Sequence, residues 1–254
     1  MQIPDFAEAE VARLRNIALV TGAGRGLGRV LAVFLAGQEY DLVITARTRA
    51  ELEEVATSIR RSGVRVSALP GDINDPGHRT RLLSETSRMG GVSLLVNNAS
   101  DIGETPLPEL AKASLERFRI TLETNLVSPL ALIQDALPQL QQTHGMVVNI
   151  TSGASQAGYE RWGIYGSSKA GLDLISKTLA TELKPLGISV VAVDPGDMRT
   201  QMHQEAFSNE DISDRPLPEV TLPFWAWLTN QDPLVVSGKR YRAQGMLWEV
   251  PATT

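Results

Sequence analysis

Short apolar runs rich in β-branched residues recur along the chain, separated by longer segments in which apolar residues return every three or four positions. Such runs are typical of buried strands, and the longer repeat is typical of the helices that cover them. We therefore predict strands at 17–21, 41–45, 65–69, 94–96, 146–150 and 188–193, with a weaker one at 240–242.

The predicted strands are apolar on both faces, as in a parallel sheet covered by helices on both sides. We predict an α/β fold with a doubly wound sheet of about seven parallel strands. No internal repeat or flexible linker divides the 254 residues, so we expect 1–254 to form a single domain. A polar, proline-containing excursion at 197–228 is followed closely by further aromatics. We expect the aromatics between Phe207 and Trp248 to close a pocket or to pack this excursion onto the body.

Composition and charge exclude several classes of function. The chain has no cysteine, which excludes a disulfide framework and a thiolate nucleophile. Its formal net charge of -5 provides no basic surface, so we expect neither nucleic acid nor a membrane as partner. His78, His144 and His203 are scattered, so we expect surface or loop positions for them and no metal site. No apolar run is long enough to span a membrane, and residues 1–16 lack the apolar stretch of a signal peptide, so we expect cytoplasmic residence.

A glycine-rich turn, Gly22-Ala23-Gly24-Arg25-Gly26-Leu27-Gly28, follows the first predicted strand and leads into a helical segment. This order lets the backbone approach a pyrophosphate, whose charge then lies at the helix N-terminus. The spacing Gly-x-x-x-Gly-x-Gly departs from the strict Gly-x-Gly-x-x-Gly pattern. We predict a dinucleotide site here, with a purely structural turn as the alternative.

The end of the second predicted strand bears on which dinucleotide binds. An acidic residue there would bind the ribose 2′-hydroxyl, whereas a basic residue would accommodate a 2′-phosphate. The sequence has Arg47 there and no carboxylate at the strand end, and Arg25 could converge on the same phosphate. We therefore predict NADP(H) in preference to NAD(H), the alternative being that Arg47 and Arg49 are merely solvated.

Tyr165 and Lys169 are four residues apart, so they share one face of a predicted helix. A neighbouring ammonium stabilises a phenolate, and we expect Lys169 to lower the pKa of Tyr165 so that the phenol can act as acid and base. Ser152 ends the fifth strand at the carboxyl edge of the sheet, where open α/β proteins bind ligands. Its hydroxyl is placed to hydrogen-bond a substrate carbonyl.

Together with Asp72-Ile73, Asn97-Asn98-Ala99-Ser100, Asn125 and Pro195-Gly196, these motifs resemble the short-chain dehydrogenase/reductase family over nearly the whole chain. The resemblance implies a single-domain Rossmann fold that transfers hydride between nicotinamide and a ketone or secondary alcohol. Tyr165 would donate the proton in reduction. Lys169 would bind the nicotinamide ribose, Ser152 would orient the substrate oxygen, and Asn125 would hold a water near Lys169.

The resemblance also implies the cofactor contacts. Asp72 would contact adenine, and Asn98 and Ala99 the adjoining ribose. The nicotinamide carboxamide would be surrounded by Pro195, Gly196, Met198 and Thr200. The resemblance also places Leu27, in the glycine turn, and Ile73, after the third strand, among the residues that bind the cofactor.

Some positions depart from the family pattern and bear on the substrate. Ser100 replaces a usual glycine, and 238–245 lacks a common Asp-Gly-Gly ending. Tyr159 and Trp162, between the catalytic serine and tyrosine, suggest an apolar or ring-bearing carbonyl substrate, with core packing as the alternative.

The leading hypothesis is an NADPH-dependent carbonyl reductase that also runs as an alcohol dehydrogenase. The alternatives are a non-catalytic NADP-binding sensor or scaffold, and an enzyme of the sugar-nucleotide epimerase or dehydratase type. Relatives associate through the helices that contain Asn125 and Tyr165, so the resemblance implies a homo-oligomer, a tetramer before a dimer.

Overall fold

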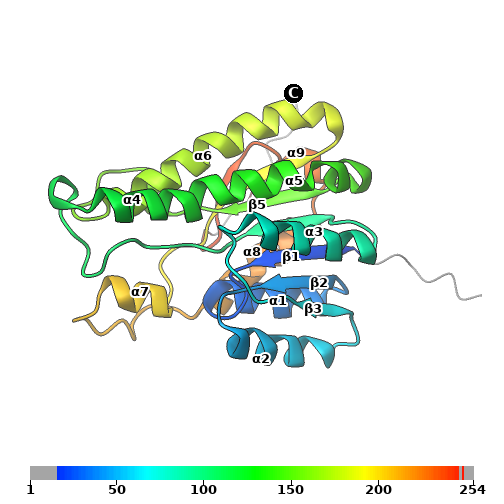
Figure 1. The fold of residues 1–254 in the computed structure, drawn as a ribbon, viewed down its shortest axis with the longest axis horizontal. Helices are drawn as coiled ribbons and strands as arrows, with labels where there is room; N and C mark the ends of the chain where they lie inside the picture. The colour runs from blue at the N-terminus through cyan, green and yellow to red at the C-terminus, as the bar shows by residue number, and fades with distance from the viewer. Residues whose placement is uncertain (1–15, 246–247, 249–254) are drawn as a thin grey trace, which may run out of the picture.

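A seven-stranded parallel sheet lies between two layers of helices in the computed structural model, which describes residues 16–245 and residue 248 (Figure 1). The strand order is β3-β2-β1-β4-β5-β6-β7, and every pair is parallel. The strands are β1 (Ile17–Thr21), β2 (Asp41–Thr45), β3 (Val66–Ala68), β4 (Leu94–Asn97), β5 (Met146–Ile150), β6 (Ser189–Asp194) and β7 (Arg240–Arg242). The prediction of a doubly wound Rossmann fold is confirmed.

The predicted strand positions agree with the structure to within a residue or two at each end. The prediction 65–69 is too long, because β3 covers only Val66–Ala68. This strand is at the edge of the sheet and pairs only with β2, and its residues are half-buried, so fewer contacts extend it.

Helices follow the strands in chain order. The longer helices are α1 (Gly26–Gly37), α2 (Arg49–Arg60), α3 (Pro76–Met89), α4 (Leu115–Leu122), α5 (Ser128–Thr143) and α6 (Gly163–Leu183). Shorter ones are α7 (Gln201–Ala206), α8 (Leu222–Thr229) and α9 (Pro233–Val236). A π-helical turn at Glu123–Val127 joins α4 to α5, and a 3-10 turn at Gly153–Ser155 follows β5.

Successive strand residues point into two separate cores, as the two-residue period of a strand requires. Ala18 and Val20 of β1 pack with α1, α2 and α8, whereas Leu19 packs with α3, α5 and α6. Figure 1 shows these helix groups on opposite faces of the sheet. Burial on both faces explains why the runs lack polar alternation.

The excursion at 197–228 is more regular than its composition predicts, because it contains α7 and α8. We expected its aromatics to close a pocket or to pack the excursion onto the body, and the structure contains both arrangements. Phe224 contacts the rings of Trp225, Trp227, Tyr241 and Trp248, which packs α8 against the last strand. Phe207 lies apart from this cluster, beside Trp162.

The expectation that all three histidines lie at the surface is wrong for His78, which is 1% exposed. Its Nε2 lies 2.7 Å from Thr45 Oγ1, so the ring lies between the end of β2 and the start of α3. Among the described residues, no helix is both long and apolar enough to cross a membrane.

Candidate functional site

A cavity of about 780 Å³ lies at the carboxyl ends of the strands, where the chain order reverses between β1 and β4. Ligands bind at this switch point in open α/β sheets. The structure brings all but two of the predicted site residues to its wall; the exceptions are Gly28 and Asn125. The residues on the wall are Gly22, Arg25, Gly26, Leu27, Arg47, Asp72, Ile73, Asn98, Ala99, Ser152, Tyr159, Trp162, Tyr165, Lys169, Pro195, Gly196, Met198 and Thr200.

The glycine turn is packed too closely for side chains at two of its positions. Gly22 has φ +67, and a Cβ there would lie 2.8 Å from the Cα of Ala99. A Cβ on Gly28 would lie 2.2 Å from the carbonyl oxygen of Gly22, so Gly28 serves helix packing rather than cavity lining. Helix α1 begins at Gly26 with backbone N–H groups that have no partner inside the helix. The turn therefore fits an anionic diphosphate.

Asn98 holds the glycine turn from the neighbouring strand. Its Nδ2 donates to the carbonyl oxygens of Thr21 and Gly22, at 2.9 and 3.2 Å. Thr21 Oγ1 accepts hydrogen bonds from the backbone N–H groups of Asn98 and Ala99. The amide of Asn98 thus shapes the site through the backbone, while the predicted ribose contact stays a prediction.

The two arginines predicted to converge on a phosphate differ in their surroundings. Arg47 is exposed and forms no ion pair or hydrogen bond within the described part of the chain. Arg25 Nη1 instead donates to Gln201 Oε1 of α7 at 2.6 Å, and the guanidinium lies 4.0 Å from the carboxylates of Glu51 and Glu205. Glu51, in the first turn of α2, also lines the cavity. The prediction missed this carboxylate because it lies past the strand end.

The predicted reaction group comes from two neighbouring elements. Tyr165 and Lys169 lie on the first turns of α6, and the ammonium is 5.5 Å from the centre of the phenol ring. Lys169 is 2% exposed, and its Nζ donates to the carbonyl oxygen of Ile150 at 2.8 Å. Ser152 follows β5 and caps the 3-10 turn, its Oγ accepting a hydrogen bond from the N–H of Ala154. A phenol, an ammonium and a hydroxyl therefore share one wall.

The expectation of a lowered phenol pKa is wrong. Burial raises the pKa of Tyr165 from its ordinary value of 10 to about 12, although hydrogen bonding with Ser100 and Ser152 lowers it. Burial also lowers the pKa of Lys169 to about 8, which the carboxylate of Asp173 partly opposes. Desolvation outweighs local attraction because both charged forms lose water on burial. The phenol is therefore protonated at neutral pH.

Asn125 is buried in the π-helical turn and is bonded to two other segments. Its Oδ1 accepts from the N–H of Asp101 and from Ser100 Oγ, and its Nδ2 donates to Asp101 O and Ser168 Oγ. These contacts use both amide donors. The side chain joins the loop after β4 to α6, and the expectation that Asn125 holds a water near Lys169 stays a prediction.

Ser100 is a site residue that the sequence did not reveal. Its hydroxyl bonds Asn125, and its hydrogen bonding with Tyr165 lowers the pKa of that phenol. The only sequence signal was that a serine replaces the usual glycine of this motif.

Aromatic rings line the cavity next to Tyr165. The Trp162 ring lies 5.8 Å from that of Tyr165, edge to face, and 5.9 Å from that of Phe207. Phe207 in turn contacts the His203 ring at 4.8 Å. Tyr159 lines the same cavity but is 56% exposed, so it lies at the rim. Trp162 is thus at a pocket wall rather than in the core.

The segment after β6 lines the cavity beside the glycine turn, where a Cβ on Gly26 would lie 3.6 Å from Thr200 Cγ2. Gly196 has φ +75, a conformation that favours glycine. Met198 is buried, and Thr200 caps α7 by accepting a hydrogen bond from the N–H of His203. The predicted nicotinamide segment therefore lines the same cavity as the glycine turn and Tyr165.

Comparisons with known proteins agree with this geometry. The family model for short chain dehydrogenase matches residues 16–211. The chain is 33% identical to 3-oxoacyl-acyl-carrier-protein reductase FabG of Staphylococcus epidermidis, over 82% of this chain and 85% of that protein. It is 32% identical to L-xylulose reductase of Bos taurus, over 84% of each.

Solved structures share the same fold. A short chain dehydrogenase from Shigella flexneri 2a, complexed with NADP, superposes with a TM-score of 0.84 at 25% identity and covers 91% of this chain and 99% of its own. A similar protein from Escherichia coli CFT073, complexed with NADPH, gives 0.83 at 25% identity, over 91% and 98%. The chain belongs to the short chain dehydrogenase family and is an NAD(P)-dependent oxidoreductase.

Proposed function

We propose that this protein is an NADPH-dependent carbonyl reductase that also works in reverse as an alcohol dehydrogenase. The observation that carries the proposal is the position of Ser152, Tyr165 and Lys169 on the wall of a cavity whose other half is a glycine turn. The names of two relatives, a 3-oxoacyl-acyl-carrier-protein reductase and L-xylulose reductase, support reduction as the reaction class.

In the proposed mechanism each side chain acts on the carbonyl oxygen or on its proton. The Ser152 hydroxyl donates a hydrogen bond to that oxygen and orients it toward Tyr165. Tyr165 gives the oxygen its phenolic proton, and the Lys169 ammonium stabilises the phenolate that remains. A bound nicotinamide supplies the hydride in reduction or accepts it in oxidation. A phenol that is protonated at neutral pH suits the reducing direction.

The test is turnover of NADPH with a panel of ketones, aldehydes, quinones and acyl thioesters, followed at 340 nm. We expect at least one carbonyl class to be reduced. If NADPH binds but no panel member is turned over, the non-catalytic sensor is the better interpretation.

We also propose that NADP(H) is preferred to NAD(H). Arg47 stands exposed at the end of β2 with no partner in the described part of the chain, so it is available to a 2′-phosphate. The Glu51 carboxylate at the same rim opposes this preference, but its ion pair with Arg25 offsets its charge. The preference therefore depends chiefly on Arg47.

The proposed mechanism predicts a pH limit set by Lys169. As pH rises through about 8, Lys169 loses its proton while Tyr165, with a pKa of about 12, keeps its own. We expect kcat/KM for reduction to be level from about pH 6 to 7.5 and to fall above pH 8. Lys169→Arg, which stays charged, should remove the alkaline fall even if its plateau is lower. A wild-type profile that rises through pH 8 would contradict this role.

The aromatic wall suggests the substrate class, an apolar or ring-bearing carbonyl compound. Removing the Trp162 ring takes away aromatic contact area worth about 1.4 kcal/mol, or roughly tenfold in binding. We expect Trp162→Ala to raise KM for acetophenone about tenfold and to leave KM for acetone within about twofold. Trp162→Phe should retain most of the acetophenone affinity. Equal KM values for wild type and Trp162→Ala with both ketones would eliminate the wall as a substrate contact.

We further propose that residues 1–254 act as one domain, that the chain forms a homotetramer, and that it resides in the cytoplasm. One continuous sheet supports the first proposal. Family resemblance supports the second, and the absence of cysteine supports the third. Size-exclusion chromatography with light scattering would measure the mass in solution.

A further inference from the structure

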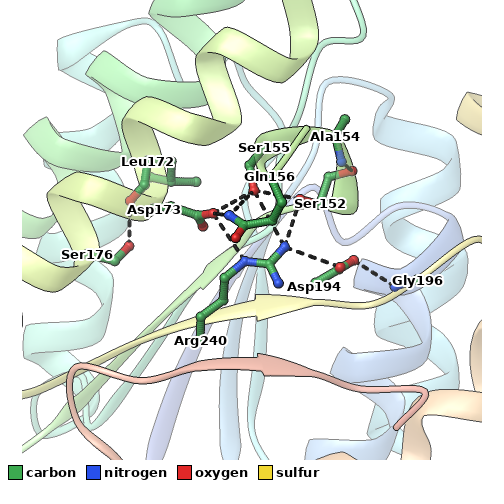
Figure 2. A network of polar contacts seen from close by, with 10 residues as sticks. All are labelled: Ser152, Ala154, Ser155, Gln156, Leu172, Asp173, Ser176, Asp194, Gly196 and Arg240. Carbon is green, nitrogen blue, oxygen red and sulfur yellow. Dashed lines mark hydrogen bonds and ion pairs between the residues drawn. The ribbon is translucent and has the colours of Figure 1, made fainter. Parts of the chain in front are cut away.

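Arg240 of β7 contacts three other segments near the proposed reacting groups: α6, the end of β6 and the residues after β5 (Figure 2). Its Nε donates to Asp173 Oδ2 of α6 at 3.1 Å. Its Nη2 donates to Asp194 Oδ2 at the end of β6, at 3.2 Å, and to the carbonyl oxygen of Ser152 at 2.8 Å. The Arg240 side chain is 19% exposed, and the two carboxylates are 7% and 8% exposed. One half-buried guanidinium thus joins α6, β6 and the segment of Ser152.

The backbone of Ser152 is held by more donors than a carbonyl ordinarily receives. Besides Arg240, the Ser155 hydroxyl and the Ser155 N–H approach the same oxygen, at 2.7 and 3.1 Å. The Ser155 hydroxyl also lies 2.6 Å from Asp173 Oδ2. Because a hydroxyl has one hydrogen, it donates to only one of these oxygens at a time. Arg240 donates to both, and therefore fixes the segment that carries the Ser152 hydroxyl.

Asp194 links Arg240 to the segment that follows β6. Its Oδ1 accepts a hydrogen bond from the N–H of Gly196 at 3.0 Å, while its Oδ2 pairs with Arg240. Gln244, just beyond β7, donates to the carbonyl oxygens of Pro195 and Asp197. The last strand and the residues after it therefore hold the 195–197 segment and Ser152 in one arrangement.

We propose that Arg240 is a positioning residue, which fixes the Ser152 hydroxyl relative to the Gly196 segment through Asp173 and Asp194. The inference rests on the proposed function, because it concerns the geometry of the same reaction. It also concerns charge, since removing Arg240 would take away the guanidinium that pairs with both buried carboxylates.

The two carboxylates also act on the reacting groups. The pKa of Tyr165 is raised mainly by burial and then by Asp194, while hydrogen bonding with Ser100 and Ser152 lowers it. The pKa of Lys169 is lowered by burial and raised by Asp173. Asp194 therefore acts on Tyr165, and Asp173 acts on Lys169. Arg240 pairs with both carboxylates, so it affects the two reacting groups through them.

A purely structural ion pair would affect stability without affecting chemistry, and the chain offers such a pair as control. Arg65 contacts the buried carboxylate of Asp41 at 2.7 Å, near the amino ends of the strands and away from the cavity. Arg240→Met and Arg65→Met each remove a guanidinium from a buried carboxylate. Only Arg240→Met removes a hydrogen bond to Ser152.

The experiment measures kcat, KM and melting temperature for wild type, Arg240→Met and Arg65→Met. Because misplacing a reacting group by about 1 Å costs up to about 100-fold in rate, we expect Arg240→Met to lower kcat about 10- to 100-fold. Its KM for NADPH should stay within about threefold, since the glycine turn is untouched. Arg65→Met should lower the melting temperature and leave kcat within about twofold. Arg240→Lys should recover only part of the loss, because one ammonium cannot serve three acceptors in this fork geometry.

A second pair of measurements keeps the inference testable if Arg240→Met fails to fold. Asp194→Asn alone should lower kcat, and in combination with Arg240→Lys the loss should be smaller than the product of the single losses, since both changes break one connection. Hydrogen exchange should be about tenfold faster for residues 151–156 in Arg240→Lys than in wild type, and unchanged there in Arg65→Met.

These outcomes separate the inference from the proposed function. An inactive wild type refutes the proposed function alone, and the exchange of residues 151–156 then decides on Arg240. If exchange at 151–156 is unchanged and kcat for the Arg240 variants equals that of Arg65→Met, Arg240 is only a structural residue and the inference is overturned.

Discussion

Tyr165→Phe is expected to lower kcat about 1,000-fold while the affinity for NADPH stays within about twofold, because the substitution removes the proposed proton donor and keeps the ring. The phenol hydroxyl lies in reach of Ser100 and Ser152, and the ring keeps its packing against Trp162. Stopped-flow reduction of an active carbonyl measures the first quantity, and quenching of protein fluorescence by NADPH measures the second.

Tyr40→Phe is the matched control for this change. Tyr40 is a half-buried phenol just before β2, away from the cavity wall, and burial raises its pKa as well. We expect its loss of one hydroxyl to leave kcat unchanged. If Tyr165→Phe retained more than a tenth of wild-type turnover, another group would have to donate the proton.

Arg47→Asp is expected to reverse the cofactor preference. Replacing a cation by a carboxylate beside a 2′-phosphate removes an attraction and adds a repulsion, together about 3 kcal/mol, or roughly 100-fold in kcat/KM for NADPH. The value for NADH should change less than about threefold or rise, since a carboxylate can accept a hydrogen bond from a 2′-hydroxyl. Steady-state kinetics with both cofactors at one carbonyl concentration give the two ratios.

Arg49→Asp makes the same charge change two residues away. Arg49 is exposed at the first position of α2 and does not line the cavity. We expect a change of less than about threefold in either cofactor, because an exposed charge at this distance is screened by salt. A matching loss for NADPH and NADH in Arg47→Asp would show that Arg47 serves the fold or the shared diphosphate instead.

The parts predicted well from sequence are those governed by local pattern. The strand β1 is buried on both faces, so its apolar run matched the structure, whereas β3 lies at an edge and ended early. The spacing of Tyr165 and Lys169 was readable because a helix places residues four apart on one face. Both side chains line the cavity, as residues on one face of a helix can.

The parts predicted poorly depend on distant contacts or on burial. The phenol pKa was placed on the wrong side of its ordinary value because the sequence gives Lys169 as a neighbour but not the loss of water around both groups. Glu51 lies in the first turn of α2 and Ser100 in the loop after β4. The local sequence around each gives no sign that its side chain lines the cavity. Arg240 lies 88 residues from the serine it contacts, beyond any local pattern.

That separation has a consequence for the order in which the protein acquires its properties during synthesis. The chain is made from its amino end, so the glycine turn, Ser152 and Tyr165 all exist before β7 does. The glycine turn rests on β1, α1 and the end of β4, all of which precede Ser152 in the chain. The arrangement around Ser152 and Gly196 needs the last strand. The Arg240 contacts that join Ser152 to the Gly196 segment therefore become possible only after the glycine turn, Ser152 and Tyr165 have been made.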